Sequence, residues 1–232
     1  MTEVRQGLSD SLETLLRNRH SCRAFNGRPV EVDTVKTILE QAQLTASWCN
    51  AQPWLVYIAS GAALERLRAM LYEASANEPA RPDLPFPGEY RGAYLDRRRA
   101  CGWSLYESVG IARGDREASN LQARENFRMF GAPHVAFVTA PRELGSYGAI
   151  DCGAWVSNFM LAASASGVSS IAQAALASYP DIVRRELGIP DGRILVCGVS
   201  FGYEEHSHPA NAYRMGRASI FESVVWVESS ED

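Results

Sequence analysis

Hydrophobic positions recur at helical spacing over much of the chain, interrupted by short apolar runs. Four leucines between positions 8 and 16 fall on one helical face and predict a first helix from about residue 10 to residue 19. The same spacing predicts further helices over 33–46, 64–71, 99–112, 115–130, 149–166 and 180–187. Apolar runs at 55–59, 134–139, 168–171 and 194–201 are typical of strands, and 224–227 is a candidate for a last strand. Helices therefore outnumber strands, and the two do not alternate simply.

The segment 149–166 is the most apolar of these helices. It carries Trp155, Phe159 and Met160 among several alanines and has little polar face, so we expect it to be the central buried helix. Its small residues would also permit close packing across a dimer. Because helices dominate without regular alternation, we predict an α+β fold in which one mixed central β-sheet is flanked by helices, with residues 1–232 forming a single domain.

An irregular segment follows the third predicted helix. Four prolines lie within residues 76–99, together with Phe86, Tyr90 and Tyr94. This composition is not that of a regular core element. Long irregular segments in compact chains are commonly functional, so we expect a lid excursion over residues 76–115, with a mobile surface loop as the alternative.

Composition and charge limit the class of partner. The chain has 232 residues, of which 46% are hydrophobic and 22% charged, as in an ordinary globular domain. A net charge of −4 argues against a nucleic-acid or anionic-membrane surface, since either needs a net basic face. No apolar run approaches the roughly 20 residues of a membrane-spanning helix. The polar first ten residues lack the apolar stretch of a signal peptide, and a cytoplasmic protein is expected.

Cysteines and histidines give no sign of a metal site or a disulfide framework. The five cysteines are an odd number, widely spread and without a CxxC pair. Cys22 and Cys49 could be reactive thiols, but without a base paired to them in sequence they are better interpreted as small neutral fillers. His206 and His208 form an HxH pair of the kind that is far more often a polar loop than a chelate. We expect no metal.

Two arginine-bearing segments lie near opposite ends of the chain. The first is Arg19-His20-Ser21-Cys22-Arg23, and the second contains Arg214 and Arg217. A guanidinium is always charged and offers a rigid fork of donors that can hold two phosphate oxygens at once. Two such segments could enclose one phosphomonoester. Taken alone, the first segment could equally be the solvated last turn of the preceding helix.

A third segment decides between these alternatives. Asn50-Ala51-Gln52-Pro53-Trp54 lies between an amphipathic helix and an apolar strand, and Ala132-Pro133 precedes another strand. Each motif is short and tolerant, but with the two arginine segments, in this order and spacing, the motifs cover nearly the whole chain. The sequence resembles the FMN-dependent nitroreductase family, and in particular its branch of nitrobenzoate and other nitroaromatic reductases.

The resemblance implies where the cofactor FMN would bind. Arg19 and Ser21, with Arg217, would hold the phosphate, while Arg23 would reach flavin N1 and O2 and stabilise the reduced ring. Asn50 suits the flavin ring because its amide both donates and accepts. The cofactor-binding residues implied in this way are Arg19, His20, Ser21, Arg23, Asn50, Gln52, Asn126, Gln173, Ala174, Ala175, Leu176, Arg214 and Arg217.

The resemblance also implies that a backbone amide within 172–176 donates to flavin N5. The best-known members carry Pro-hydrophobic-Glu-Gly at this point, whereas this chain has Gln173-Ala174-Ala175. Which amide meets N5 is therefore left open. The role itself is preserved, because a backbone N–H does not depend on its side chain.

Substrate binding is expected on the lid. Phe86, Tyr90, Tyr94 and Trp103 could form an aromatic wall against which a flat acceptor stacks. Trp103 could instead be a core residue of its helix, so the wall need not include all four.

The activity implied by the resemblance is that of a homodimeric FMN oxidoreductase with its flavin sites at the subunit interface. It would take hydride from NADH or NADPH and reduce nitroaromatics or quinones in a ping-pong cycle, with the flavin and no protein side chain as the catalytic group. No GxGxxG fingerprint follows a strand, which favours transient stacking of nicotinamide on the flavin. The alternatives are a flavin-dependent dehalogenase or oxidase of a small molecule, and a non-catalytic flavin-binding protein.

Overall fold

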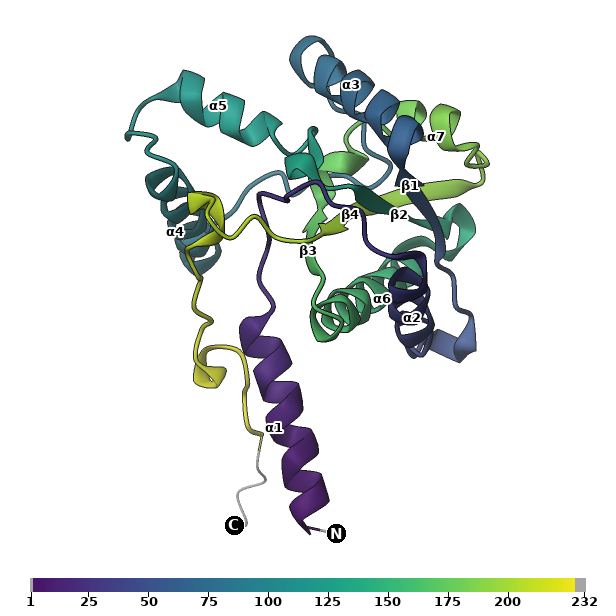
Figure 1. Cartoon of the computed structure of the whole chain (residues 1–232), viewed down its shortest axis with the longest axis vertical. Coiled ribbons are helices and arrows are strands. Elements are labelled where there is room, and N and C mark those ends of the chain that lie inside the picture. The colour runs from purple at the N-terminus through teal and green to yellow at the C-terminus, as the bar shows by residue number, and fades with distance from the viewer. Residues whose placement is uncertain (1, 228–232) are drawn as a thin grey trace.

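The computed structural model describes residues 2–227 and contains seven α-helices around a four-stranded sheet (Figure 1). The helices are α1 (Thr2–Asn18), α2 (Val32–Gln43), α3 (Gly61–Asn77), α4 (Gly92–Ser108), α5 (Arg116–Arg124), α6 (Gly145–Ala165) and α7 (Pro180–Leu187). The strands are β1 (Leu55–Ser60), β2 (His134–Pro141), β3 (Ser169–Gln173) and β4 (Arg193–Gly202). The α+β fold expected from the sequence is confirmed.

The four strands form one sheet in the order β1-β2-β4-β3, and each neighbouring pair is antiparallel. We expected a mixed sheet, but among the described residues the parallel contact is an isolated bridge between Ser21 and Ser170. The hydrophobic pattern of a strand shows which faces are buried and not the direction of its neighbour, so the pairing could not be predicted. The bridge places the first arginine segment beside β3.

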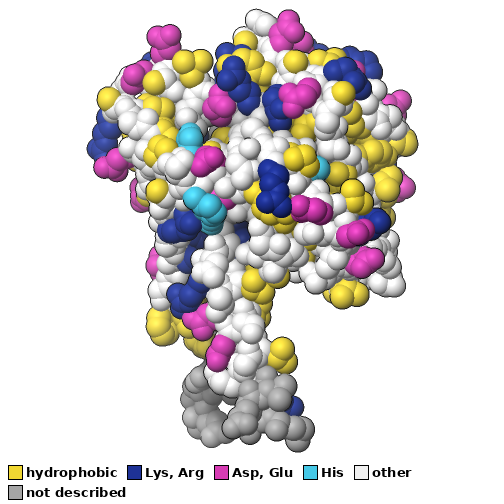
Figure 2. Space-filling view, in the orientation of Figure 1, with side chains coloured by type: hydrophobic (Ala, Val, Ile, Leu, Met, Phe, Trp, Pro, Cys, Tyr) yellow, Lys and Arg dark blue, Asp and Glu magenta, His cyan; other side chains and the backbone are white. Residues whose placement is uncertain are grey.

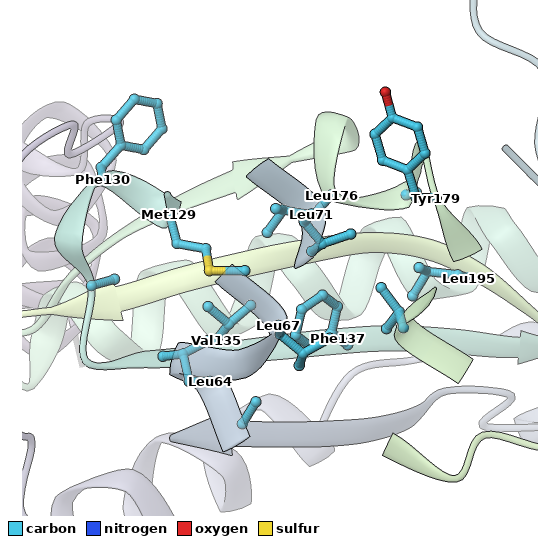
Figure 3. Close-up of a cluster of buried hydrophobic side chains, with 14 of the residues drawn as sticks. Leu64, Leu67, Leu71, Met129, Phe130, Val135, Phe137, Leu176, Tyr179 and Leu195 are labelled. Carbon is cyan, nitrogen blue, oxygen red and sulfur yellow. The ribbon is translucent and has the colours of Figure 1, made fainter. Parts of the chain in front are cut away.

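Each face of the sheet carries its own hydrophobic core. Alternate residues of β2 point to opposite faces, so Phe137 belongs to one core and Val138 to the other. On the first face the leucines of α3 pack near Phe137 (Figure 3). On the second face Trp155 and Phe159 of α6 stack on each other, and Phe159 meets Phe201 of β4 edge to face. The sheet is therefore a rigid centre to which the functional loops are attached.

The long apolar helix α6 lies at the centre as expected, but only one of its faces is covered. Trp155 and Phe159 are buried, whereas Tyr147 and Ile150 remain 58% and 62% exposed. The helix thus presents an apolar strip that the single chain does not bury. Neither α6 nor any other described helix is both long and apolar enough to span a membrane.

The first helix and the C-terminal segment project from the same side of the body (Figure 1). The helix α1 begins at Thr2, earlier than expected. Three of its leucines, Leu8, Leu12 and Leu16, are more than half exposed. Residues 224–227, which were a candidate strand, follow the short 3₁₀ turn Ile220–Glu222 and form no ladder with the described strands. Apolar composition alone does not make a strand where the chain offers no neighbour to pair with.

The segment expected as a lid divides into a fixed part and a projecting part. Asp83 is held against the body, where its carboxylate pairs with Arg184 and accepts a hydrogen bond from the Leu195 amide at 2.8 Å. By contrast, α4 begins at Gly92 and contains no buried residue. The next helix, α5, ends at Arg124, well before the expected residue 130, and Met129 and Phe130 adopt left-handed backbone in a separate turn.

Candidate functional site

The structure brings the two arginine segments together around one cavity of about 660 Å³, here called the arginine cavity. The predicted residues that line it are Arg19, His20, Ser21 and Arg23 from the first segment and Arg214 and Arg217 from the second. Figure 2 shows basic and histidine side chains grouped where the projecting part of the molecule joins the body. Residues almost 200 positions apart in the sequence therefore share one site, as the sequence analysis predicted.

Asn211 joins the two arginine segments. It is 3% exposed, and its side-chain oxygen accepts a hydrogen bond from the Arg23 amide at 2.6 Å. Its side-chain nitrogen donates to the carbonyl oxygens of Ala24 at 2.9 Å and Glu205 at 3.1 Å. Sequence reasoning missed this residue, because a single asparagine in a loop has no signature that separates a buried tie from an exposed turn.

The first arginine segment is also hydrogen-bonded to the sheet, and Phe25 just after it is bonded to the left-handed turn at Met129–Gly131. The Cys22 amide donates to the Ser170 carbonyl at 3.2 Å, and the Phe25 amide donates to the Phe130 carbonyl at 3.1 Å. The thiol of Cys22 is buried and donates to the Ala24 carbonyl, and burial raises its pKa to about 12. Cys22 is therefore an inert filler that helps to shape the loop, in agreement with the interpretation from the sequence.

The charges of the arginine cavity are not balanced by neighbouring carboxylates. Among the described side chains, Arg19, Arg23, Arg214 and Arg217 form no salt bridge, although Arg17 pairs with Glu13. Burial, and then the nearby charge of Arg217, lower the pKa of Arg19 from its ordinary value. Two guanidinium groups that repel each other at the wall of a cavity favour an anion between them. A phosphate dianion has the required charge and the acceptor oxygens.

His20 lines the cavity, but its ring nitrogens serve the protein. Nδ1 lies 3.1 Å from the Asn18 carbonyl oxygen, and Nε2 lies 3.2 Å from a carboxylate oxygen of Glu204. Glu204 is nearly buried and also accepts from the Ser169 hydroxyl at 3.3 Å. The ring of His20 therefore fastens the loop to Glu204 and β3. Both ring nitrogens therefore already have partners in the protein, and a ligand in the cavity would meet the ring carbons or the backbone of His20.

Tyr213 lines the cavity, but its hydroxyl group is turned into the protein. Its oxygen is buried and makes no hydrogen bond to the described residues, and burial raises the pKa of this phenol. The guanidinium carbon of Arg23 lies 5.6 Å from the centre of its ring. Leaving a buried hydroxyl without a partner costs about 1–3 kcal/mol.

A second group of predicted residues lies at the end of β3. The Gln173 side chain is buried, donates to the Asn126 carbonyl at 2.9 Å and to the Asn126 side-chain oxygen at 3.2 Å, and accepts from the Ser200 hydroxyl. The structure thus brings Asn126 and Gln173 together. Because the amide of Gln173 is used inside the protein, its role is to orient Asn126.

The residues after Gln173 provide free backbone donors. Ala174–Ala177 form a 3₁₀ turn in which Ala174 is exposed, Ala175 is half-buried and Leu176 is fully buried. The leading amides of such a turn have no partner within it. Leu176 packs closely against Gly198. A β-carbon added at position 198 would lie 2.5 Å from the Leu176 side chain. This contact fixes the turn, and it leaves the amides of Ala174 and Ala175, but not that of the fully buried Leu176, as candidates for the expected donor to a flavin.

Asn50 and Gln52 lie away from the arginine cavity in the single chain. The Trp48 amide donates to Asp151 of α6 at 3.3 Å, whereas Arg19 and Ser164, near the other end of α6, line a second small cavity. At 1.5 Å a residue, the stretch from position 151 to position 164 spans about 20 Å. Cys49, Asn50 and Gln52 all have left-handed backbone, a strain that persists where the surrounding structure requires it.

The four aromatic residues predicted for the substrate do not line the arginine cavity. Tyr94 is 70% exposed, Phe86 and Tyr90 are also exposed, and Tyr90 lies under the guanidinium of Arg98. Trp103 lines a separate cavity of about 320 Å³ beside Arg113. The residue of α4 that reaches the arginine cavity is Cys101.

The model of the nitroreductase family matches residues 16–203, which include the first arginine segment, Asn50 and the whole sheet. The chain belongs to the nitroreductase family. The expectation drawn from the four motifs is thereby confirmed. The match ends before Arg214 and Arg217, so the second wall of the arginine cavity comes from a part of the chain outside the family model.

Curated relatives resemble this nitroreductase-family chain over almost its full length. Nitroreductase NfnB of Mycolicibacterium smegmatis is 37% identical over 218 residues, which cover 94% of this chain and 93% of that protein. Nitrobenzene nitroreductase of Ectopseudomonas oleovorans is 31% identical, with coverage of 94% and 98%. The crystal structure of the FMN-dependent nitroreductase NfnB from Mycobacterium smegmatis in complex with NADPH superposes with a TM-score of 0.91 at 36% identity, covering 95% of this chain and all of that one.

Proposed function

We propose that this protein is an FMN-dependent NAD(P)H oxidoreductase that reduces nitroaromatic compounds or quinones in a ping-pong cycle. The observation that carries the proposal is the arginine cavity, where several guanidinium groups that form no salt bridge to a described carboxylate line one cavity in a nitroreductase-family fold. Relatives named for NADPH, nitrobenzene and 4-nitrobenzoate support the choice of donor and acceptor.

The residues present fit FMN. Arg19 and Arg217, with Ser21, would hold its phosphate, because they repel each other in the absence of an anion. Arg23 would stand beside flavin N1 and O2 and favour the anionic reduced ring. The amide of Ala174 or Ala175 would donate to N5, with Asn126 oriented beside it by Gln173.

Bound FMN would supply the hydride chemistry by accepting two electrons from the nicotinamide and passing them to the acceptor in a second half-reaction. The protein then has to bind donor and acceptor in turn over the same face of the flavin. It holds the cofactor at its phosphate, orients the ring through backbone and amide groups and supplies positive charge from Arg23. No protein nucleophile is required.

We further propose that the protein acts as a homodimer in which each flavin site is shared. Residues 48–52 around Asn50 are here called the Asn50 loop. In one chain the Asn50 loop and the arginine cavity lie near opposite ends of α6. A second copy could bring its own Asn50 loop to the cavity. The exposed leucines of α1 and the apolar strip of α6 around Ile150 support this arrangement, because contiguous exposed apolar surface marks association sites. A cytoplasmic location, expected from the sequence, stays part of the proposal.

The proposed function is tested by the visible spectrum of the purified protein. FMN-loaded protein should bleach when NADPH or NADH is added without oxygen, and the colour should return when nitrobenzene or a quinone follows. A protein that cannot be loaded with FMN would contradict the proposed cofactor. A yellow protein that neither nicotinamide bleaches would instead favour a dehalogenase, an oxidase or a flavin carrier.

A further inference from the structure

Two glutamine side chains connect the core to the Asn50 loop. Trp54 is 8% exposed, packs in the core on the α6 side of the sheet and donates from its indole Nε1 to Oε1 of Gln43 at 3.0 Å. Gln43, the last residue of α2, donates from Nε2 to Oε1 of Gln52 at 3.1 Å. Gln52 donates from its own Nε2 to the backbone carbonyl oxygen of Asn50 at 3.1 Å. These three hydrogen bonds are here called the glutamine network.

The two ends of the glutamine network fix the direction of every bond in it. An indole N–H can only donate, and a backbone carbonyl oxygen can only accept. The amide oxygen of Gln43 must therefore face Trp54, which turns its nitrogen toward Gln52. The nitrogen of Gln52 must likewise face Asn50. Rotating either amide would set two donors or two acceptors against each other, so the network has one arrangement.

The backbone that this network supports is strained. Asn50 and Gln52 have φ angles of 53° and 46°, in the left-handed region that residues other than glycine adopt uncommonly. Such strain persists where neighbouring contacts over-determine the backbone. Two further ties act here: the Gln52 amide donates to the Ser47 hydroxyl at 2.9 Å, and Arg193 donates to the Pro53 carbonyl oxygen at 2.7 Å. The loop is therefore held in one shape.

The glutamine network leaves the side chain of Asn50 as the group that the loop can offer a ligand. Both polar atoms of the Gln52 side chain are already bonded within the protein. The hydrogen bonds that Asn50 makes to the described residues all involve its backbone, and the residue is exposed. Its amide can both donate and accept, as the polar edge of a flavin ring requires.

We propose that Gln43 is a positioning residue for the flavin ring: acting through Gln52, it holds the exposed amide of Asn50 in the orientation that the ring requires. The inference rests on the proposed function and on the proposed dimer, in which the Asn50 loop of one chain serves the cavity of its partner. It gives the side chain of Gln52 a role within the loop and not at the cofactor.

The inference is tested with Gln43→Met, which keeps the length of the side chain and its lack of charge but removes both hydrogen bonds. Asn50→Ala should weaken FMN binding about fivefold, as for the loss of one ordinary hydrogen bond. Gln43→Met should weaken it by about twofold to fivefold, because the amide is still present but no longer held. Both variants should lower the reduction potential of bound FMN, since a donated hydrogen bond favours the electron-rich reduced ring. Gln41→Met, on the exposed surface of the same helix, is the matched control and should behave as the wild type.

The double variant Gln43→Met/Asn50→Ala separates positioning from a general loss of structure. Its affinity and potential should equal those of Asn50→Ala, because the amide to be positioned is gone. Additive effects of the two substitutions would overturn the inference, and so would a wild-type affinity and potential in either single variant. A wild-type protein that bound no FMN would instead refute the proposed function itself.

Discussion

Arg19, Arg23 and Arg217 line one cavity but have different surroundings. Burial, and then the nearby charge of Arg217, lower the pKa of Arg19. Arg23 lies on the ring of Tyr213, and its amide is fixed by Asn211. The first pair is arranged for an anion placed between two cations, whereas Arg23 is a single charge held in one position. These different surroundings support the proposed division of labour between phosphate binding and the flavin ring.

Replacing these arginines separately should give different defects. Arg217→Ala should weaken FMN binding by about tenfold or more, since it removes a charge-assisted hydrogen bond to phosphate. Arg23→Ala should leave more cofactor bound but slow its reduction, because the charge near N1 and O2 is lost. Flavin fluorescence titrations measure the first effect, and rapid anaerobic mixing with NADPH measures the second. Equal losses of both properties in both variants would contradict the division.

At the scale of elements, the entry to α2 is tied to the start of β2 by one histidine. The Val30 amide, two residues before α2, donates to Nε2 of His134 at 2.9 Å. The ring of His134 also stacks on Phe201 of β4 with 5.1 Å between centres. Burial lowers the pKa of His134 below its ordinary value of 6.5. A ring that accepts at Nε2 must be neutral, so the tie depends on pH.

Protonation of His134 should therefore destabilise the fold. Its contribution is fully present above pH 6.5, where both states are neutral, and is lost as the pH falls below 6.5, because the unfolded chain takes up the proton first. His134→Gln, which keeps an acceptor that does not titrate, should remove this part of the pH dependence. Urea unfolding of both proteins between pH 7.5 and about pH 5 measures the difference. Parallel stability profiles would contradict the role of His134.

At the scale of the whole molecule, much apolar surface is left open. The leucines of α1, the strip of α6 around Ile150 and the segment from Ile220 to Val227 are exposed in the single chain. Patches of this kind are rare on monomers. The separation of the Asn50 loop from the arginine cavity is a second observation that supports the proposed dimer.

A charge placed on this surface should dissociate the proposed dimer. Leu12→Asp should shift the protein to a monomer in light scattering, because an unpaired carboxylate would have to be buried in an apolar interface. FMN binding should weaken with it, since each site would lose the partner's loop. Thr14→Asp adds the same charge two positions along the helix, on the other side of α1, and should leave the dimer intact. A dimeric Leu12→Asp protein would contradict the proposed interface.

The sequence by itself was sufficient for the fold class, the main elements and the arginine cavity. Amphipathic spacing identifies helices such as α3 and α6 because it is a local property, set by the 3.6-residue repeat and the burial of one face. The predicted ends of α1, α4 and α5 were wrong, because the end of a helix depends on which segments find a surface to pack on.

Only the tertiary structure decided what each polar residue does. Asn211 and Tyr213 acquire their roles from burial beside Arg23, and Gln173 is turned toward Asn126 by its place at the end of β3. Strand direction and the division of the expected lid into a part fixed on the body and an exposed helix α4 were likewise settled by packing. The physical reason is the same in each case: hydrophobic periodicity is local and can be read along the chain, whereas a buried hydrogen bond joins groups whose neighbours are determined only when distant segments meet.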